Sequence, residues 1–203
     1  MRFLASIVAV SAVTGMATAD LINPLVPDWR GDANATYAYW DSFTSADGGP
    51  NFPEQGGGFQ LFNFGQGAII AGSGNLYGAG GALDIHVYSL GELAPTEAVL
   101  SFSFLGNPID TSDVQAFFNG SYIDPLTSEL RGESGGGGFS AQTWSFTYDF
   151  SNIAGDSGSV AFFFGSELAN SSLDAVSVDV LSIPAPGAIA LLTLAGLGSR
   201  RRR

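Results

Sequence analysis

The 203-residue sequence contains no cysteine and no lysine, and His86 is its single histidine. Without cysteine, the chain has no disulfides, no thiol catalysis and no cysteine-ligated zinc or iron–sulfur site. Its stability must therefore come from core burial and sheet hydrogen bonds. Without lysine, Schiff-base chemistry and Lys–Asn isopeptide crosslinks are excluded. A zinc site would need carboxylates for its remaining protein ligands, which is uncommon.

Basic residues are scarce and lie mainly at the two ends of the chain. Between residues 20 and 183 only Arg30 and Arg131 are basic, whereas all nineteen acids fall there, so this segment has a formal charge of −17. Such a surface repels phosphate backbones, which excludes nucleic-acid binding, and it disfavours adhesion to anionic lipid. Calcium, other cations and neutral glycans remain as partners. The acidity also fits a simple role in keeping an exported protein soluble.

The first nineteen residues have the composition of a secretory signal peptide. Arg2 supplies a positive charge, residues 3–13 are almost wholly apolar, and Ala17 and Ala19 form an A-x-A cleavage site. We therefore expect a signal helix over residues 1–19, cleavage after Ala19 and a mature chain that starts at Asp20. A buried N-terminal helix is the alternative.

The last twenty-one residues, 183–203, form a second targeting segment. A proline-containing turn precedes an apolar run, and the chain then stops on four arginines, which resist translocation and stay on the cytoplasmic side. The run from 187 to 199 has thirteen residues, about 20 Å as a helix, against a hydrocarbon core of about 30 Å. We expect a transmembrane helix of marginal length, suited to transient retention. The residues of this signal are Pro184, Ala185, Pro186, Gly187, Arg200, Arg201, Arg202 and Arg203.

This tail resembles the PEP-CTERM sorting signal of bacteria, and its Pro-Ala-Pro-Gly start is similar to the variant seen in planctomycete-like bacteria. The resemblance implies recognition by an exosortase-type membrane protease that cleaves near the Pro-x-Pro motif. The chain departs from the usual motif at one position, where Ala185 replaces the central glutamate. Residues Trp29, Arg30, Gly31 and Trp40 also resemble the opening of other exported proteins that bear this tail.

Residues 20–182 are predicted to form one all-β domain. Alternation of apolar and polar residues, the mark of a strand with one buried face, is clearest at residues 143–150 and recurs along the domain. Asn119-Gly120 predicts a type I′ hairpin turn. Gly-rich or polar breaks are expected at 47–58, 72–81, 132–138 and 155–158. The other expected strands cover residues 37–43, 59–64, 83–88, 100–104, 114–118, 121–123, 160–164 and 176–180.

Eight to nine such strands indicate an antiparallel, jelly-roll-like two-sheet sandwich, because sheets of this size must cover their apolar faces. A closed barrel is the alternative. The segment 172–180 is similar to the last strand of carbohydrate-binding jelly rolls, although any closing strand can have this pattern.

No catalytic residue is expected. His86 lies on the polar side of its strand, which favours a solvent-facing or cross-strand histidine, and no G-x-S-x-G elbow supports a Ser-His-Asp triad. Glycoside hydrolysis needs two carboxylates across a groove. The candidate pairs, Glu92 with Glu97 and Glu129 with Glu133, lie in apparent loops.

Two binding sites are considered. Calcium is a possible ligand of acids expected at strand ends, although no segment has EF-hand spacing and scattered solvated acids are the alternative. These acids are Asp110, Asp113, Asp124, Asp156 and Asp174. An aromatic platform for stacking on sugar rings is the second possibility, with core packing as its alternative. Its candidates are Trp29, Tyr37, Tyr39 and Trp40.

Together these features predict an exported protein, held in the membrane by its tail during sorting and then located at the cell surface or in the extracellular matrix. Its domain is expected to be a non-catalytic structural or adhesive module without a cofactor. Binding to extracellular polysaccharide, with or without calcium, is the first alternative, and a glycan-active hydrolase is the second.

Mass spectrometry of the native protein tests both ends. We expect Asp20 as the first residue, and a last residue near Ile183 if a membrane protease removes the tail. A native chain that still ends at Arg203 would contradict processing and would indicate a simple membrane anchor.

Overall fold

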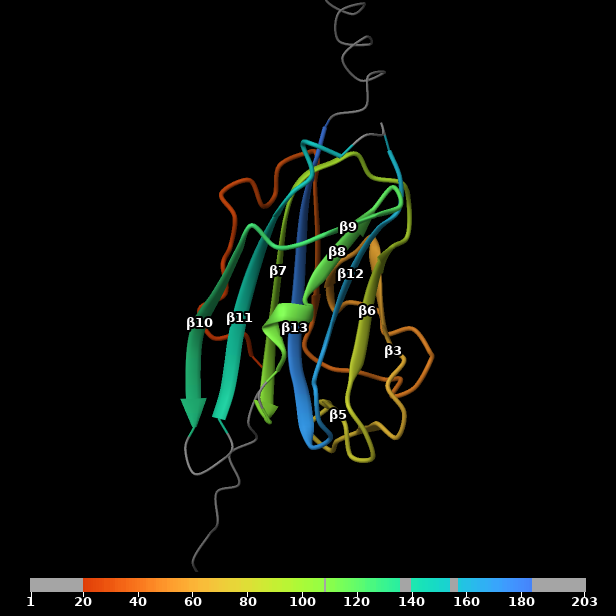
Figure 1. The fold of residues 1–203 in the computed structure, drawn as a ribbon, viewed down its shortest axis with the longest axis vertical. Helices are drawn as coiled ribbons and strands as arrows, with labels where there is room; N and C mark the ends of the chain where they lie inside the picture. The colour runs from red at the N-terminus through yellow and green to blue at the C-terminus, as the bar shows by residue number, and fades with distance from the viewer. Residues whose placement is uncertain (1–19, 108, 136–139, 154–156, 184–203) are drawn as a thin grey trace, which may run out of the picture.

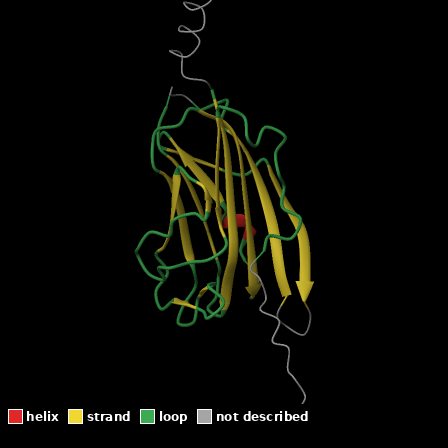
Figure 2. Cartoon of the chain, turned by 180° about the vertical axis from the view of Figure 1, so that it is seen from behind, coloured by secondary structure: helices red, strands yellow, loops and turns green. Residues whose placement is uncertain are grey.

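The computed structural model describes residues 20–107, 109–135, 140–153 and 157–183, and in these the chain forms two antiparallel β-sheets that pack face to face (Figure 1). Strands make up both layers, and within the described residues the one helix is a short 3-10 turn, η1 (Thr111–Asp113) (Figure 2). The expectation of an all-β, two-sheet domain is therefore confirmed. The expected signal and transmembrane helices fall outside the described residues.

Sheet A has the strand order β10-β11-β7-β13-β1-β2, and the short pair β4 and β5 joins it through β13. The first and last strands of the domain are neighbours, with Ala35 opposite Leu181 and Trp40 opposite Val176. The strands are β1 (Ala35–Trp40), β2 (Gln55–Gly56), β4 (Ile69–Ile70), β5 (Leu76–Tyr77), β7 (Pro95–Gly106), β10 (Thr127–Gly135), β11 (Ser140–Asp149) and β13 (Ser171–Ser182).

Sheet B has the order β3-β6-β12-β8-β9. The predicted turn at Asn119-Gly120 joins β8 to β9, and both residues have positive φ, 48° and 81°, as a type I′ turn requires. The strands are β3 (Phe59–Asn63), β6 (Asp84–Ser89), β8 (Gln115–Phe118), β9 (Ser121–Ile123) and β12 (Val160–Gly165).

The core lies between the sheets and is rich in phenylalanine. Alternate residues of each strand point inward, so that Phe102 of β7 stacks on Phe164 of β12 with ring centroids 4.4 Å apart and planes 9° from parallel. Tyr148 of β11 packs edge-on against Phe162 of β12, with ring centroids 5.5 Å apart. Each such side chain removes a large apolar area from water, which is the main source of stability in a chain without disulfides.

The outer face of sheet A is covered by the segment 20–34. Its backbone N–H groups donate to hydroxyls of β11, from Ile22 to Thr143 Oγ1 at 2.8 Å and from Leu25 to Ser145 Oγ at 3.1 Å. Arg30 then binds the buried carboxylate of Asp179 through Nε and Nη2, at 2.6 and 2.5 Å. The guanidinium carbon of Arg30 also lies 4.2 Å from the centre of the Tyr37 ring. This segment is therefore an integral part of the fold.

Several expectations about strands were wrong. The break expected at 132–138 is occupied through Gly135 by β10, whose side chains are mostly exposed on both faces. Glu129 and Glu133 lie in β10 and Glu97 lies in β7, so these three acids are not in loops. The two-residue strands β2, β4 and β5 were not expected, because strands so short have no measurable alternation.

The Arg30–Asp179 pair generates a stability prediction. Burial raises the pKa of the Asp179 carboxyl above 3.8, while the hydrogen bonds and charge of Arg30 lower it. Arg30→Gln should destabilise the domain by about 3 kcal/mol at pH 7, because it leaves a buried carboxylate without its counter-charge. Removing Arg30 also raises the folded-state pKa further, and protonation then relieves the cost. The deficit in urea unfolding relative to the wild type should shrink as the pH falls towards 4.

Arg131→Gln is the matched control. Arg131 forms an exposed ion pair with Glu129 at 2.8 Å, and such pairs contribute less than about 1 kcal/mol. Equal losses from the two substitutions, or a deficit for Arg30→Gln that does not change with pH, would contradict the assignment.

Candidate functional site

The solvent-facing side of sheet B carries a continuous group of aromatic rings, which we call the outer aromatic layer. Phe163 of β12 lies at its centre, and its ring centroid is 4.7 Å from that of His86, 6.1 Å from that of Tyr88 and 5.9 Å from that of Tyr122. The layer spans all five strands of the sheet and a residue that follows β3. Its members are Phe62, Phe64, His86, Tyr88, Phe117, Tyr122 and Phe163.

Strand register explains why these rings meet. His86 is opposite Phe163 on one side and Phe62 on the other, and Phe117 is opposite Tyr122. These residues alternate with the inward-facing ones, so the sheet has aromatic rings on both faces. Tyr122 remains 66% exposed and Phe64 46% exposed. The other rings of the layer are partly buried against one another.

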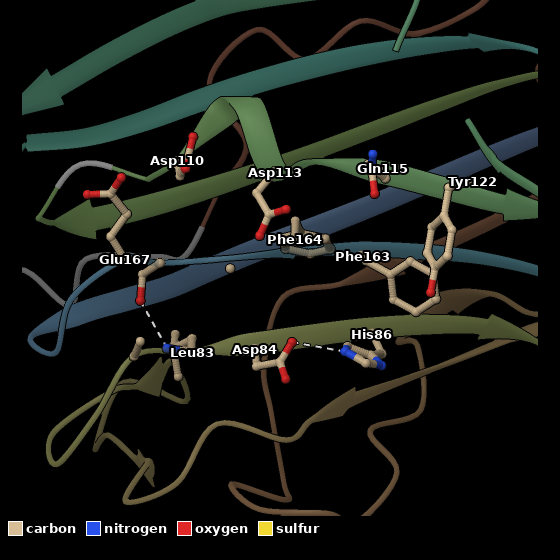
Figure 3. A pocket seen from close by; sticks show the side chains of 13 residues that line it. Leu83, Asp84, His86, Asp110, Asp113, Gln115, Tyr122, Phe163, Phe164 and Glu167 are labelled. Atoms are coloured by element: carbon tan, nitrogen blue, oxygen red, sulfur yellow. Dashed lines mark hydrogen bonds and ion pairs between the residues drawn. The ribbon is translucent and has the colours of Figure 1, made fainter. Parts of the chain in front are cut away.

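A hollow of about 530 Å³ adjoins the layer (Figure 3). Asp84 and His86 of β6 form one wall, and η1 with the start of β8 forms the other. Between them lies β12, where a Cβ on Gly165 would come 2.2 Å from the carbonyl oxygen of Leu83, so this position requires glycine. In Figure 3, Tyr122 and Phe163 lie at one end and Asp110 and Glu167 at the other.

His86 is fixed by two polar neighbours on its own strand. Its Nε2 lies 2.9 Å from Asp84 Oδ1 and its Nδ1 lies 2.8 Å from the hydroxyl oxygen of Tyr88. Burial, together with the charges of Asp84 and Tyr122, raises the pKa of Tyr88, so its hydroxyl stays protonated and donates to Nδ1. His86 then donates from Nε2 to Asp84. This arrangement orients the imidazole among the rings. The expectation of a cross-strand histidine is confirmed, and the ring is only partly exposed to solvent.

Four carboxylates line the hollow, and no arginine is among its lining residues. Asp84 and Asp113 point into it from opposite walls (Figure 3). At Asp110, hydrogen bonds from the hydroxyl and the backbone N–H of Ser112 lower the pKa of the carboxyl, so it stays ionised. The hollow therefore favours neutral or cationic ligands and repels anionic ones.

The acids considered for calcium do not converge as a group. Asp110 and Asp113 share the hollow, Asp124 accepts from Gln115 Nε2 at 2.8 Å, and Asp174 accepts from Asn75 Nδ2 at 2.5 Å. Asp156 lies outside the described residues. In the described part of the chain, no three histidine or acidic side chains are placed to hold a metal ion.

The four residues considered for an aromatic platform do not form one. Trp40 is fully buried in the core and donates from Nε1 to the carbonyl oxygen of Asn51 at 3.0 Å. Tyr37 and Tyr39 lie on the outer face of sheet A, where Arg30 packs on Tyr37. Trp29 lines a separate hollow of about 580 Å³ at the end of β7 and β11. The alternative of core packing therefore holds for Trp40, and the outer aromatic layer lies on the opposite sheet.

The residues of the two targeting signals lie almost wholly outside the described chain. Ala17, Ala19 and the eight residues of the sorting signal are not described, whereas Asp20 is exposed and its backbone N–H donates to the carboxyl of Asp174. Over residues 20–183, with the gaps given above, no helix has the length and apolar character needed to cross a membrane.

The outer aromatic layer was missed because the alternation of apolar and polar residues leads one to expect a single apolar face for each strand. In 160–164 every residue is apolar, which gives no sign that Phe163 faces outward. The one available signal was the pair of large rings flanking the Asn119-Gly120 turn on opposite sides, Phe117 and Tyr122. A hairpin places these two residues opposite each other on one face.

No protein-family model, curated protein or solved structure matches this chain.

Proposed function

We propose that this chain is an exported, non-catalytic binding module of the cell surface or extracellular matrix, and that it binds polysaccharide through the outer aromatic layer and the adjoining hollow. The observation that carries the proposal is the continuity of exposed rings with a carboxylate-lined hollow on one sheet face. This adhesive role develops the expectation from the sequence, in which polysaccharide was a candidate partner.

The chemistry of the face matches that of a sugar chain. A pyranose ring has an apolar C–H face that packs on aromatic rings, and its rim of hydroxyls donates to carboxylate and amide oxygens. Tyr122 and Phe163 provide the rings, while Asp84, Asp113 and Gln115 provide polar groups beside them. A hollow of about 530 Å³ lies within the usual range for small-ligand sites. Its negative charge favours neutral or amine-bearing polymers over uronic-acid polymers.

The strand pairing supports a jelly-roll interpretation of the domain. A jelly roll is a long antiparallel hairpin rolled into two sheets, so that strands pair from the ends of the chain inward. Here β1 pairs with β13, β6 with β12, β7 with β11, and β8 with β9. We infer that β3 and β10 extend the two sheets beyond these eight strands.

The targeting part of the proposal depends on the sequence. A signal peptide over residues 1–19 and a PEP-CTERM-like tail over 183–203 would export the chain, hold it in the membrane and present it to an exosortase-type protease. The domain between them, at a formal charge of −17, would then be released to the surface or matrix.

Binding can be measured by affinity electrophoresis against neutral, amine-bearing and acidic polysaccharides. Tyr122→Ala and Phe163→Ala should each weaken binding to the best neutral or amine-bearing polymer about tenfold, equivalent to about 1.4 kcal/mol. Leu126→Ala is the matched control, because Leu126 is 72% exposed and does not line the hollow. Unchanged binding in both aromatic variants, or selective binding of acidic polymers, would refute the proposal.

A glycan hydrolase is the second candidate, and one observation favours it: Asp84 and Asp113 point into the same hollow from opposite walls (Figure 3). Glycoside hydrolysis uses two carboxyl groups about 5 Å or about 6.5–9.5 Å apart, one of them protonated to serve as the acid. Asp110, whose pKa is lowered, is unsuited to that acid role.

Release of reducing ends from the bound polymer distinguishes the two candidates. We expect the wild type to release no more than the double variant Asp84→Asn/Asp113→Asn, which should bind more weakly but measurably because each asparagine keeps one acceptor oxygen. Release by the wild type that the double variant loses would establish the hydrolase instead.

A further inference from the structure

A second group of acids lies on sheet A, at the start of the described chain. It comprises Asp20, Asp41, Asp174 and Glu54, which interact electrostatically with one another. Asp174 is 92% buried, since only 8% of its surface is exposed. Among the residues that the structure describes, no salt bridge joins a basic side chain to Asp41, Glu54 or Asp174. We call it the Asp174 cluster.

A β-bulge in β13 creates the cluster. Leu173 is opposite Phe104 and Ala175 is opposite Ser103, so Asp174 is the extra residue that has no partner in β7. At the same level β13 changes its other neighbour, from β5 at Leu173 to β1 at Val176. Asp41, directly after β1, and Asn75, directly before β5, therefore lie near Asp174 along the edge of β13 that faces away from β7.

The cluster is rich in acceptor oxygens and short of donors. Asn75 donates Nδ2 to Asp174 Oδ1 at 2.5 Å, and the backbone N–H of Asp20 donates to the same carboxyl. Two further buried oxygens, Asp41 Oδ1 and Asn75 Oδ1, have no hydrogen-bond partner within the described residues. Asn75 is itself 8% exposed. Buried acceptors of this kind are costly unless a donor or a cation satisfies them.

We propose that the missing cation is the chain's own α-ammonium group, which forms at Asp20 when the signal peptide is cleaved after Ala19 and binds the carboxylate of Asp174. The Asp20 nitrogen already bonds that carboxyl as an amide. Cleavage converts this single neutral donor into a charged group with three N–H donors, beside the carboxyl groups of Asp41 and Asp174. The inference rests on the proposed export, because it requires Asp20 to be the first residue.

A metal ion fits the cluster less well than the ammonium does. Calcium needs six to eight oxygen ligands at 2.3–2.6 Å, and the described acids include no group of three placed for such a site. The carboxylate oxygens of Glu54 already accept hydrogen bonds from the backbone N–H groups of Asp41 at 2.9 Å and Ser42 at 3.0 Å, so they are less available to a metal ion. An ammonium group already covalently held beside Asp174 needs only one or two of these oxygens.

The absence of lysine makes a clean experiment possible, because the α-amine is the sole amine in a chain that starts at Asp20. Residues 20–203 can be produced behind a leader that is removed without a scar, kept in mild detergent, and acetylated with an amine-reactive ester. Acetylation restores the neutral amide of the uncleaved chain. Thermal unfolding by circular dichroism should show a midpoint about 2–4 °C lower after acetylation.

Two variants assign this shift to the Asp174 cluster. In Asp174→Asn the effect of acetylation should fall below about 1 °C, because the partner charge is gone. In Asp149→Asn, the matched control at the exposed end of β11, the effect should equal that of the wild type. No shift in the wild type, or the same shift in Asp174→Asn, would overturn the inference.

A second measurement covers the case in which Asp174→Asn does not fold. The paired amine should react with the ester at least about tenfold more slowly in the native wild type than in urea, since the ion pair withholds its lone pair. Equal rates would overturn the inference. A native N-terminus other than Asp20 would refute the proposed processing, whereas failure of these tests on a chain starting at Asp20 would refute the ion pair alone.

Discussion

The position of β13 between β1 and β7 is the constraint on which the rest of the structure depends. The last strand of the domain is also a central one, and it joins residues as distant in sequence as Ala35 and Leu181. Both buried charge sites belong to it, Asp179 on its outer face and Asp174 at its bulge. Until β13 docks, sheet A is divided and the segment 20–34 lacks the partner of Arg30. Such long-range pairing makes folding slow compared with local hairpins.

The sequence was enough to predict an all-β domain, because inward-facing residues of the long strands alternate with polar ones over 143–150 and 176–180. The hairpin at Asn119-Gly120 was predictable for the same local reason. β10 was not, because its residues 127–135 are polar on both sides and contain glycine, and nothing local distinguishes such an edge strand from a loop. Its pairing with β11 is a property of the sheet rather than of the segment.

The candidate site was much less predictable than the fold. Its rings come from separate strands and meet only through the order β3-β6-β12-β8-β9, which alternation does not encode. Its acids come from β6, η1 and the loop after β12. The dense group of aromatics at 37–40 offered both a platform and core packing, and Trp40 is fully buried in the core. Assigning a large ring to the core or to the surface requires knowing what lies across the sheet.

The ion pair of Arg30 has a consequence for cleavage by proteases. Proteases that cut after basic residues have two peptide bonds to attack between residues 20 and 183, one after Arg30 and one after Arg131. The side chain of Arg30 is partly buried and binds the carboxylate of Asp179, whereas Arg131 lies at the register shift of β10 and binds Glu129 and the backbone carbonyl of Asn23. Within residues 20–183, trypsin-like enzymes therefore have few bonds to cut. The scarcity of basic residues that makes this segment acidic also limits its cleavage by such enzymes.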